Sequence, residues 1–153
     1  MKINDKILRW IKLGIFILYI SILVYFLFFA DMLGRTSSAT NYRYNLTPFK
    51  EIRRFIVYSG HLGVASVFTN LLGNVVAFIP VGIFLPILSN NRLEFYQVTV
   101  FTFALTLSIE LIQLLSKVGI FDVDDMILNT LGGMIGYLLF FGWKSLKERK
   151  NLK

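Results

Sequence analysis

The sequence contains no cysteine and a single histidine, His61, among its 153 residues. The absence of cysteine excludes disulfide bonds, thiol nucleophiles and thiolate metal ligands. A single histidine also argues against a multi-histidine zinc site and a Ser-His-Asp catalytic triad. We therefore predict neither a metal site nor a cofactor, and we interpret His61 as a polar residue at a membrane interface.

Charged residues are also scarce. They make up 16% of the chain, whereas hydrophobic residues make up 56% and the mean hydropathy is +0.65. A soluble globular domain usually carries about 25% charged and about 45–50% apolar residues. The composition therefore indicates a membrane protein, and the length is that of one domain over residues 1–153.

The net charge of +7 is unevenly distributed. Nine of the sixteen Lys and Arg residues lie in residues 1–12 and 144–153, beside hydrophobic stretches. Positive charge in such flanks fixes the orientation of membrane helices. We therefore expect no nucleic acid partner, and we expect the basic ends to contact membrane lipids.

Four stretches are long and apolar enough to cross a bilayer as helices, which takes about 20 residues each. They are residues 13–30, 70–88, 95–116 and 126–143. The first stretch exceeds the apolar core of a signal peptide and no A-x-A cleavage motif follows it, so we interpret it as a retained span. The predicted fold is an all-α, polytopic membrane helix bundle.

A further helix is predicted at the membrane surface, over about residues 48–59. Thr47 followed by Pro48 is typical of a helix start, with the proline at the first helical position. Four apolar residues share one face of this segment: Phe49, Ile52, Phe55 and Ile56. Such a segment lies in the interface or packs on a partner, and both interpretations stay open.

An even number of spans places both termini on one side of the membrane. With the termini inside, the inner segments carry ten Lys and Arg residues and the outer loops carry six. Because positive charge accumulates on the cytoplasmic side, we predict that both termini are cytoplasmic.

Polar residues recur along the third predicted span at helical spacing. Six of them lie 3, 4, 4, 3 and 4 positions apart and form one stripe: Thr99, Thr102, Thr106, Glu110, Gln113 and Lys117. An ionised residue at mid-helix costs roughly 2.5–3.5 kcal/mol on insertion scales and by default indicates a functional site. The alternative is that Glu110 pairs with Lys117, Arg53 or Arg54 and only holds the bundle together.

The fourth and second spans repeat this pattern. The residues at helical spacing are Asp125, Asn129, Gly132 and Gly136 in the fourth span, and Asn70, Asn74 and Ala77 in the second. Gly132 and Gly136 form a small-residue motif and are predicted to let two helices pack closely. The asparagines could also serve as interhelical hydrogen-bonding groups. Pro80 and Pro86 are predicted to break the second span.

The topology brings the polar residues of these spans to one membrane face, opposite the termini. The candidates for a ligand-binding or functional site are Asn70, Asn74, Glu110, Gln113, Asp122, Asp124, Asp125 and Asn129. Together they predict an acidic, amide-rich cup. Two alternatives remain for the three aspartates, which could form a solvated loop, with Asp125 capping the fourth helix.

Several short motifs resemble the VanZ-like family. They are residues 45–49 (NLTPF), 70–74 (NLLGN), 78–82 (FIPVG), 108–113 (SIELIQ), 121–125 (FDVDD) and 129–133 (NTLGG). The resemblance covers about residues 45–137 and implies a small multi-span protein of the bacterial plasma membrane. It also implies a role in tolerance of teicoplanin, a glycopeptide with a lipid tail. Family members often carry an arginine shortly before the Asp-x-Asp-Asp run, where this chain has Lys117.

Three classes of function fit these features. We favour a non-catalytic binding protein whose cup engages a glycopeptide or a lipid-linked cell-wall precursor through carboxylate and amide groups. The first alternative is a membrane-embedded enzyme that uses Glu110 and the aspartates as acid and base. The second is a transporter built on the broken second span, which would require an oligomer.

Overall fold

The computed structural model describes residues 4–30, 42–58 and 64–151, without the side chains of residues 5, 29–30 and 64–70. The elements in chain order are α1 (Asp5–Tyr25), the π-helical turn η1 (Phe26–Ala30), β1 (Tyr44–Asn45), α3 (Lys50–Val57), α5 (Val64–Leu88), α6 (Phe95–Ser116), β2 (Phe121–Asp122) and α7 (Val123–Asn151). The fold is all-α, as predicted. His61 and the side chain of Asn70 lie outside the described part.

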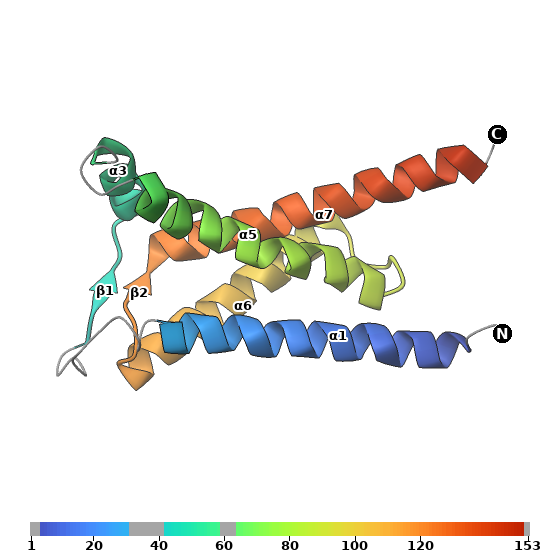
Figure 1. Cartoon of the computed structure of the whole chain (residues 1–153), viewed down its shortest axis with the longest axis horizontal. Coiled ribbons are helices and arrows are strands. Elements are labelled where there is room, and N and C mark those ends of the chain that lie inside the picture. Colours follow the sequence, from blue (N-terminus) through green and yellow to red (C-terminus); the bar gives the residue numbers. More distant parts are fainter. Residues whose placement is uncertain (1–3, 31–41, 59–63, 152–153) are drawn as a thin grey trace.

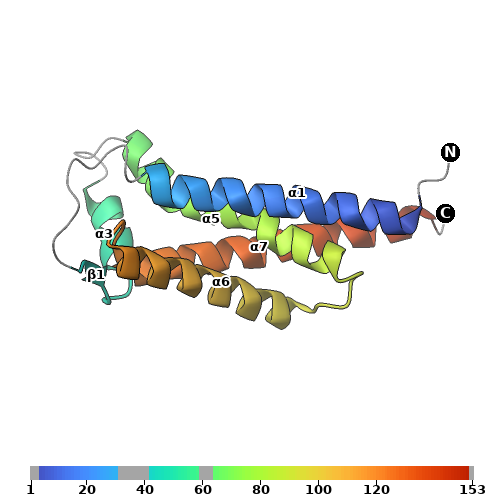
Figure 2. The ribbon, with the colours of Figure 1, turned by 90° about the horizontal axis from the view of Figure 1, so that it is seen from below.

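Four helices have the length and hydropathy of membrane spans. The apolar segments are Lys6–Phe28, Leu71–Leu88, Phe95–Ser116 and Val123–Asn151. The four long helices lie side by side along one axis (Figures 1 and 2). The N-terminal end of α1 and the C-terminal end of α7 lie at the same end of the bundle, and α3 and the two strands lie at the other end. We call these the terminal end and the loop end.

Two expectations about proline are wrong. Helix α3 begins at Lys50 rather than at Pro48, because Phe49 adopts a left-handed conformation, with φ 63°, and ends the preceding turn. Helix α5 runs unbroken past Pro80 and Pro86. Neighbouring groups can satisfy the backbone that a proline frees in a membrane helix, so a proline need not break it.

Helix α7 packs closely against α5 along its glycine face. A Cβ atom added at Gly132 would lie 2.1 Å from the carbonyl oxygen of Val75, and one at Gly136 would lie 2.0 Å from that of Ile79. Gly133 faces α6 instead, since a Cβ atom added there would lie 2.5 Å from Oγ1 of Thr102 on that helix. The small residues of α7 therefore let α5 and α6 approach its backbone on two sides.

Helix α1 lies at the periphery, against α5. The rings of Phe16 and Phe84 are 5.6 Å apart, and the Tyr19 hydroxyl donates to the carbonyl oxygen of Ala77. Leu23 completes the contact by joining a buried apolar cluster that includes Phe78. These pairs fix an antiparallel register, in which the start of α1 lies beside the end of α5.

Candidate functional site

The loop end is organised by a short parallel pairing between two distant segments. Strand β1 pairs with β2 in the register Tyr44 to Phe121 and Asn45 to Asp122, and the amide of Phe121 donates to the carbonyl of Arg43 at 3.1 Å. The segment that precedes α3 is thereby held against the connection between α6 and α7.

Asp122 is the meeting point of this pairing. Its Oδ1 atom accepts hydrogen bonds from Nδ2 of Asn45 at 3.0 Å and from the amide of Asp124 at 2.9 Å. Its own amide donates to Oε2 of Glu110 at 2.8 Å. Asp122 therefore caps the start of α7, a role that the sequence had left open for Asp125. It also joins α6 and α7 to β1.

Glu110 is buried in α6, with 3% of its surface exposed. The sequence left open whether this carboxylate pairs with a cation or belongs to a site. The bond from the Asp122 amide gives it a backbone partner at the base of the loop end. A hydrogen bond from a backbone amide lowers the cost of burying a carboxyl group.

Asp124 binds the start of helix α3. Its Oδ1 atom accepts from the amide of Phe49 at 2.5 Å, and its Oδ2 atom accepts from the amides of Glu51 at 2.7 Å and Ile52 at 3.2 Å. The first amides of a helix lack partners within the helix, and a carboxylate there is favourable. Asp124, which is 1% exposed, supplies that cap from a different helix.

Two amide side chains of the predicted cup make contacts between helices. Nε2 of Gln113 donates to the carbonyl oxygen of Leu27 at 3.0 Å, which ties α6 to the π-helical end of α1. Nδ2 of Asn129 donates to Oγ1 of Thr106 at 2.8 Å between α7 and α6. Within the described residues, Oδ1 of Asn129 is buried without a hydrogen-bond partner.

Asp125 is the most accessible of the three aspartates. It is half-buried, and its Oδ1 atom accepts from Nδ2 of Asn74 on α5 at 2.5 Å. This bond joins two of the polar faces that the sequence placed on separate spans. Asp125 also lines the cavity described next.

A cavity of about 730 Å³ opens at the loop end, and we call it the loop-end cavity. Its lining includes four acidic residues and three basic ones, which are Glu51, Asp122, Asp124 and Asp125, and Arg43, Lys50 and Arg54. Gln113, Asn45 and two tyrosines, Tyr42 and Tyr44, complete its polar wall. The cavity therefore offers hydrogen-bond donors and acceptors of both charges.

Among the acidic residues of this lining, Asp122 has a raised pKa. Burial raises the pKa of its carboxyl above the ordinary value, and the carboxylates of Asp124 and Glu51 act in the same direction. The hydrogen bonds from the Asp124 amide and the Asn45 side chain oppose that rise in pKa. Across the described residues, no three acidic or histidine side chains gather closely enough to hold a metal ion.

The structure gathers most of the predicted site residues at the loop end, but in different roles. Glu110, Asp122 and Asp124 are buried and bonded to the backbone, while Asn129 lies deeper, against α6. A ligand role for these residues stays a prediction. Five charged or amide residues of the cavity were not predicted from the sequence: Arg43, Asn45, Lys50, Glu51 and Arg54.

A signal for two of the missed residues was present in the sequence. Asn45 begins the NLTPF motif, and Lys50 follows it directly. A polar motif before an amphipathic helix is typical of a segment that docks on another element. Nothing in the sequence identified β2 as the partner, because the pairing spans 77 residues.

Comparison with known proteins agrees with the motifs. A model of the VanZ/LLP1 family matches residues 16–145. The chain is 29% identical over 130 residues to Protein VanZ of Enterococcus faecium, an alignment that covers 83% of this chain and 71% of that protein. No solved structure matches the chain. Since the family model covers well over half of the sequence, this membrane-embedded protein belongs to the VanZ/LLP1 family.

Proposed function

We propose that this protein lowers bacterial susceptibility to lipid-tailed glycopeptides by binding a peptide-like ligand in the loop-end cavity. The proposal places the loop end at the outer face of the plasma membrane, because the basic termini at the opposite end favour the cytoplasm. The link to teicoplanin rests on the family resemblance and on the similarity to Protein VanZ.

The observation that carries the proposal is the composition of the loop-end cavity. Carboxylates from α7 and β2 meet cations from α3 and from the segment before β1 in one space of about 730 Å³. A volume of about 300–1,000 Å³ is typical of sites for small ligands. Amide groups and charges of both signs suit a peptide-like ligand, which carries donors, acceptors and charged ends.

The position of the cavity explains why a lipid tail would matter. A ligand that is anchored in the outer leaflet gains about 0.8 kcal/mol of membrane affinity for each buried CH₂ group. Anchoring also confines the ligand to the level of the lipid headgroups, where the loop end lies in this orientation. A protein acting there would meet lipidated glycopeptides more often than unlipidated ones.

The test compares drug susceptibility in a bacterium that expresses the wild type or Asp125→Asn at equal membrane abundance. Asparagine keeps the oxygen that accepts from Asn74 but removes the charge facing the cavity. Loss of a charged hydrogen-bond partner costs about 1.5–3 kcal/mol, or roughly 10–100-fold in affinity. We expect the wild type to protect against teicoplanin and the variant to lose most of that protection.

The matched control is Glu148→Gln, which removes one exposed negative charge at the terminal end of α7. It should protect as well as the wild type. Equal protection by Asp125→Asn would contradict the assignment of the cavity. Equal protection by the wild type against lipidated and unlipidated glycopeptides would contradict the role of the lipid tail.

A further inference from the structure

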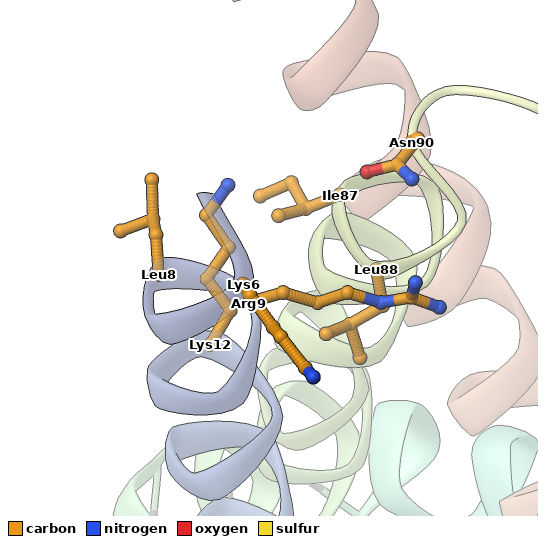
Figure 3. Close-up of a pocket in the computed structure, with 7 residues that line it drawn as sticks. All are labelled: Lys6, Leu8, Arg9, Lys12, Ile87, Leu88 and Asn90. Atoms are coloured by element: carbon orange, nitrogen blue, oxygen red, sulfur yellow. The ribbon is translucent and has the colours of Figure 1, made fainter. Parts of the chain in front are cut away.

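A second cavity lies at the terminal end of the bundle, between the start of α1 and the end of α5. Its volume is about 470 Å³. Three basic residues line it, Lys6, Arg9 and Lys12, and none of its described lining residues is acidic. Figure 3 shows the three basic side chains arising from one side of α1, with Arg9 extending beside Leu88 of α5. We call this the terminal-end cavity.

The spacing of the three basic residues makes each a neighbour of the next. Lys6 and Arg9, and likewise Arg9 and Lys12, lie three positions apart along α1 and so fall on neighbouring turns. None forms an ion pair with an acidic residue whose side chain the structure describes. Like charges that line one cavity repel one another, and a bound anion would relieve that repulsion.

The terminal-end cavity lies at the boundary between hydrocarbon and water. Lys12 is the last charged residue before eighteen uncharged positions that run through α1 and η1, and Leu88 ends the apolar run of α5. The ring contact between Phe16 and Phe84, 5.6 Å apart, fixes the two helices in register one turn further in. Lipid headgroups occupy this level of a membrane.

The end of α5 does not repel an anion as strongly as a bare helix end would. The last carbonyl groups of a helix carry partial negative charge. Here the Leu85 carbonyl accepts from the amide of Ser89 at 3.0 Å, and the Pro86 carbonyl accepts from the amide of Asn91 at 2.8 Å. The side chain of Asn90, at the edge of the cavity, can add a donor.

We propose that the terminal-end cavity binds the phosphate of an anionic membrane lipid. The Arg9 guanidinium can hold two phosphate oxygens at once, and Lys6 and Lys12 act as point charges beside it. Leu88 and Ile87 add an apolar part to the lining, which would meet the start of the acyl chains. That apolar continuation favours a lipid over a free phosphate compound.

The test measures lipid retained by the full-length protein in a neutral detergent, by native mass spectrometry. The probes are dioleoylphosphatidylglycerol, dioleoylphosphatidylcholine, which has no net charge, and inorganic phosphate. We expect the wild type to retain phosphatidylglycerol and neither of the other probes. Arg9→Gln should bind phosphatidylglycerol at least about fivefold more weakly, as expected for the loss of one cation near an anionic surface. Arg9→Lys should recover part of the binding, because lysine restores the positive charge but cannot hold two phosphate oxygens at once as a guanidinium does.

The control for general electrostatics is Lys150→Gln. It removes an exposed positive charge at the same end of the bundle but outside the terminal-end cavity. Unchanged retention in this variant supports the site. Three results would overturn it: an equal loss in Lys150→Gln, equal retention of phosphatidylcholine, or displacement of the lipid by millimolar inorganic phosphate.

Discussion

Asp124 caps a helix that begins 74 positions earlier in the chain, through the amide of Phe49, which lies 2.5 Å from its Oδ1 atom. Phe49 itself makes no side-chain capping bond, and its φ of 63° turns the backbone so that the following amides face α7. The short helix α3 thus depends on a carboxylate from another helix. This relationship gives a structural reason for an aspartate that the sequence assigned to ligand binding.

Asp124→Asn should detach α3 from the bundle. The asparagine can keep one acceptor, but its amide group would face the amides of Glu51 and Ile52, which are donors too. Hydrogen bonds to a charged group contribute about 1.5–3 kcal/mol, so we expect a lower unfolding temperature in detergent. We also expect faster protease cleavage near residues 50–57, measured by mass spectrometry. Wild-type cleavage kinetics in Asp124→Asn would contradict the capping role, and Glu148→Gln controls for loss of an acidic residue.

Gly136→Ala should destabilise the contact between α7 and α5. The new methyl group would lie 2.0 Å from the carbonyl oxygen of Ile79, so the helices must move apart. Overpacking of this kind costs typically about 1–3 kcal/mol. The measurement is thermal unfolding of the purified protein in detergent.

Gly142→Ala is the matched control on the same helix. A Cβ atom there would meet nothing within 4 Å. Alanine is favoured over glycine inside a helix by about 0.8–1.0 kcal/mol, so this variant should unfold at an equal or higher temperature. If both substitutions changed stability in the same direction, close packing at Gly136 would not be the cause.

The pH dependence of stability should reveal the raised pKa of Asp122. A group whose pKa is higher in the folded state stabilises folding when it is protonated. That contribution is complete below the ordinary value of 3.8 and is lost as the pH rises through the raised pKa. Asp122→Asn, which keeps an acceptor for Asn45 and for the Asp124 amide, should remove this dependence.

The measurement for Asp122 is the unfolding temperature of both proteins between about pH 4 and pH 8, across the window in which the linkage acts. The wild type should lose stability relative to Asp122→Asn as the pH rises. A constant difference between the two proteins would mean that Asp122 has the same pKa in the folded and unfolded states.

Gln113→Leu should loosen the end of α1 from the bundle. The substitution removes the donor to the Leu27 carbonyl, which lies at 3.0 Å, and a buried acceptor left without a partner costs about 1–3 kcal/mol. Ser108→Ala on the same helix is the control, because the Ser108 hydroxyl donates to the carbonyl of Ala104 within the same helix, one turn away. We expect a lower unfolding temperature for Gln113→Leu alone. An equal decrease in both variants would contradict the assigned role of Gln113.

The sequence by itself determined the helical architecture. Long uncharged stretches can only be buried in a membrane as helices, because the backbone must satisfy its own hydrogen bonds there. The same logic brought Glu110, Asp122 and Asp125 to one end of the bundle, since connected helices alternate in direction. Local chemistry around Pro48 and Pro80 was less informative, because the neighbouring structure decides whether a proline starts or breaks a helix.

Only the tertiary structure decided what each polar residue at that end does. Asp124 and Asp125 are adjacent in the chain, yet one caps α3 and is buried, while the other contacts Asn74 at the edge of the loop-end cavity. Helical geometry turns successive side chains about 100° apart, so neighbours meet different elements. The partners of these carboxylates, among them Phe49 and Asn74, come from segments more than 50 positions away. Spacing along the chain places a charge at one end of the bundle, but the folded contacts assign its role.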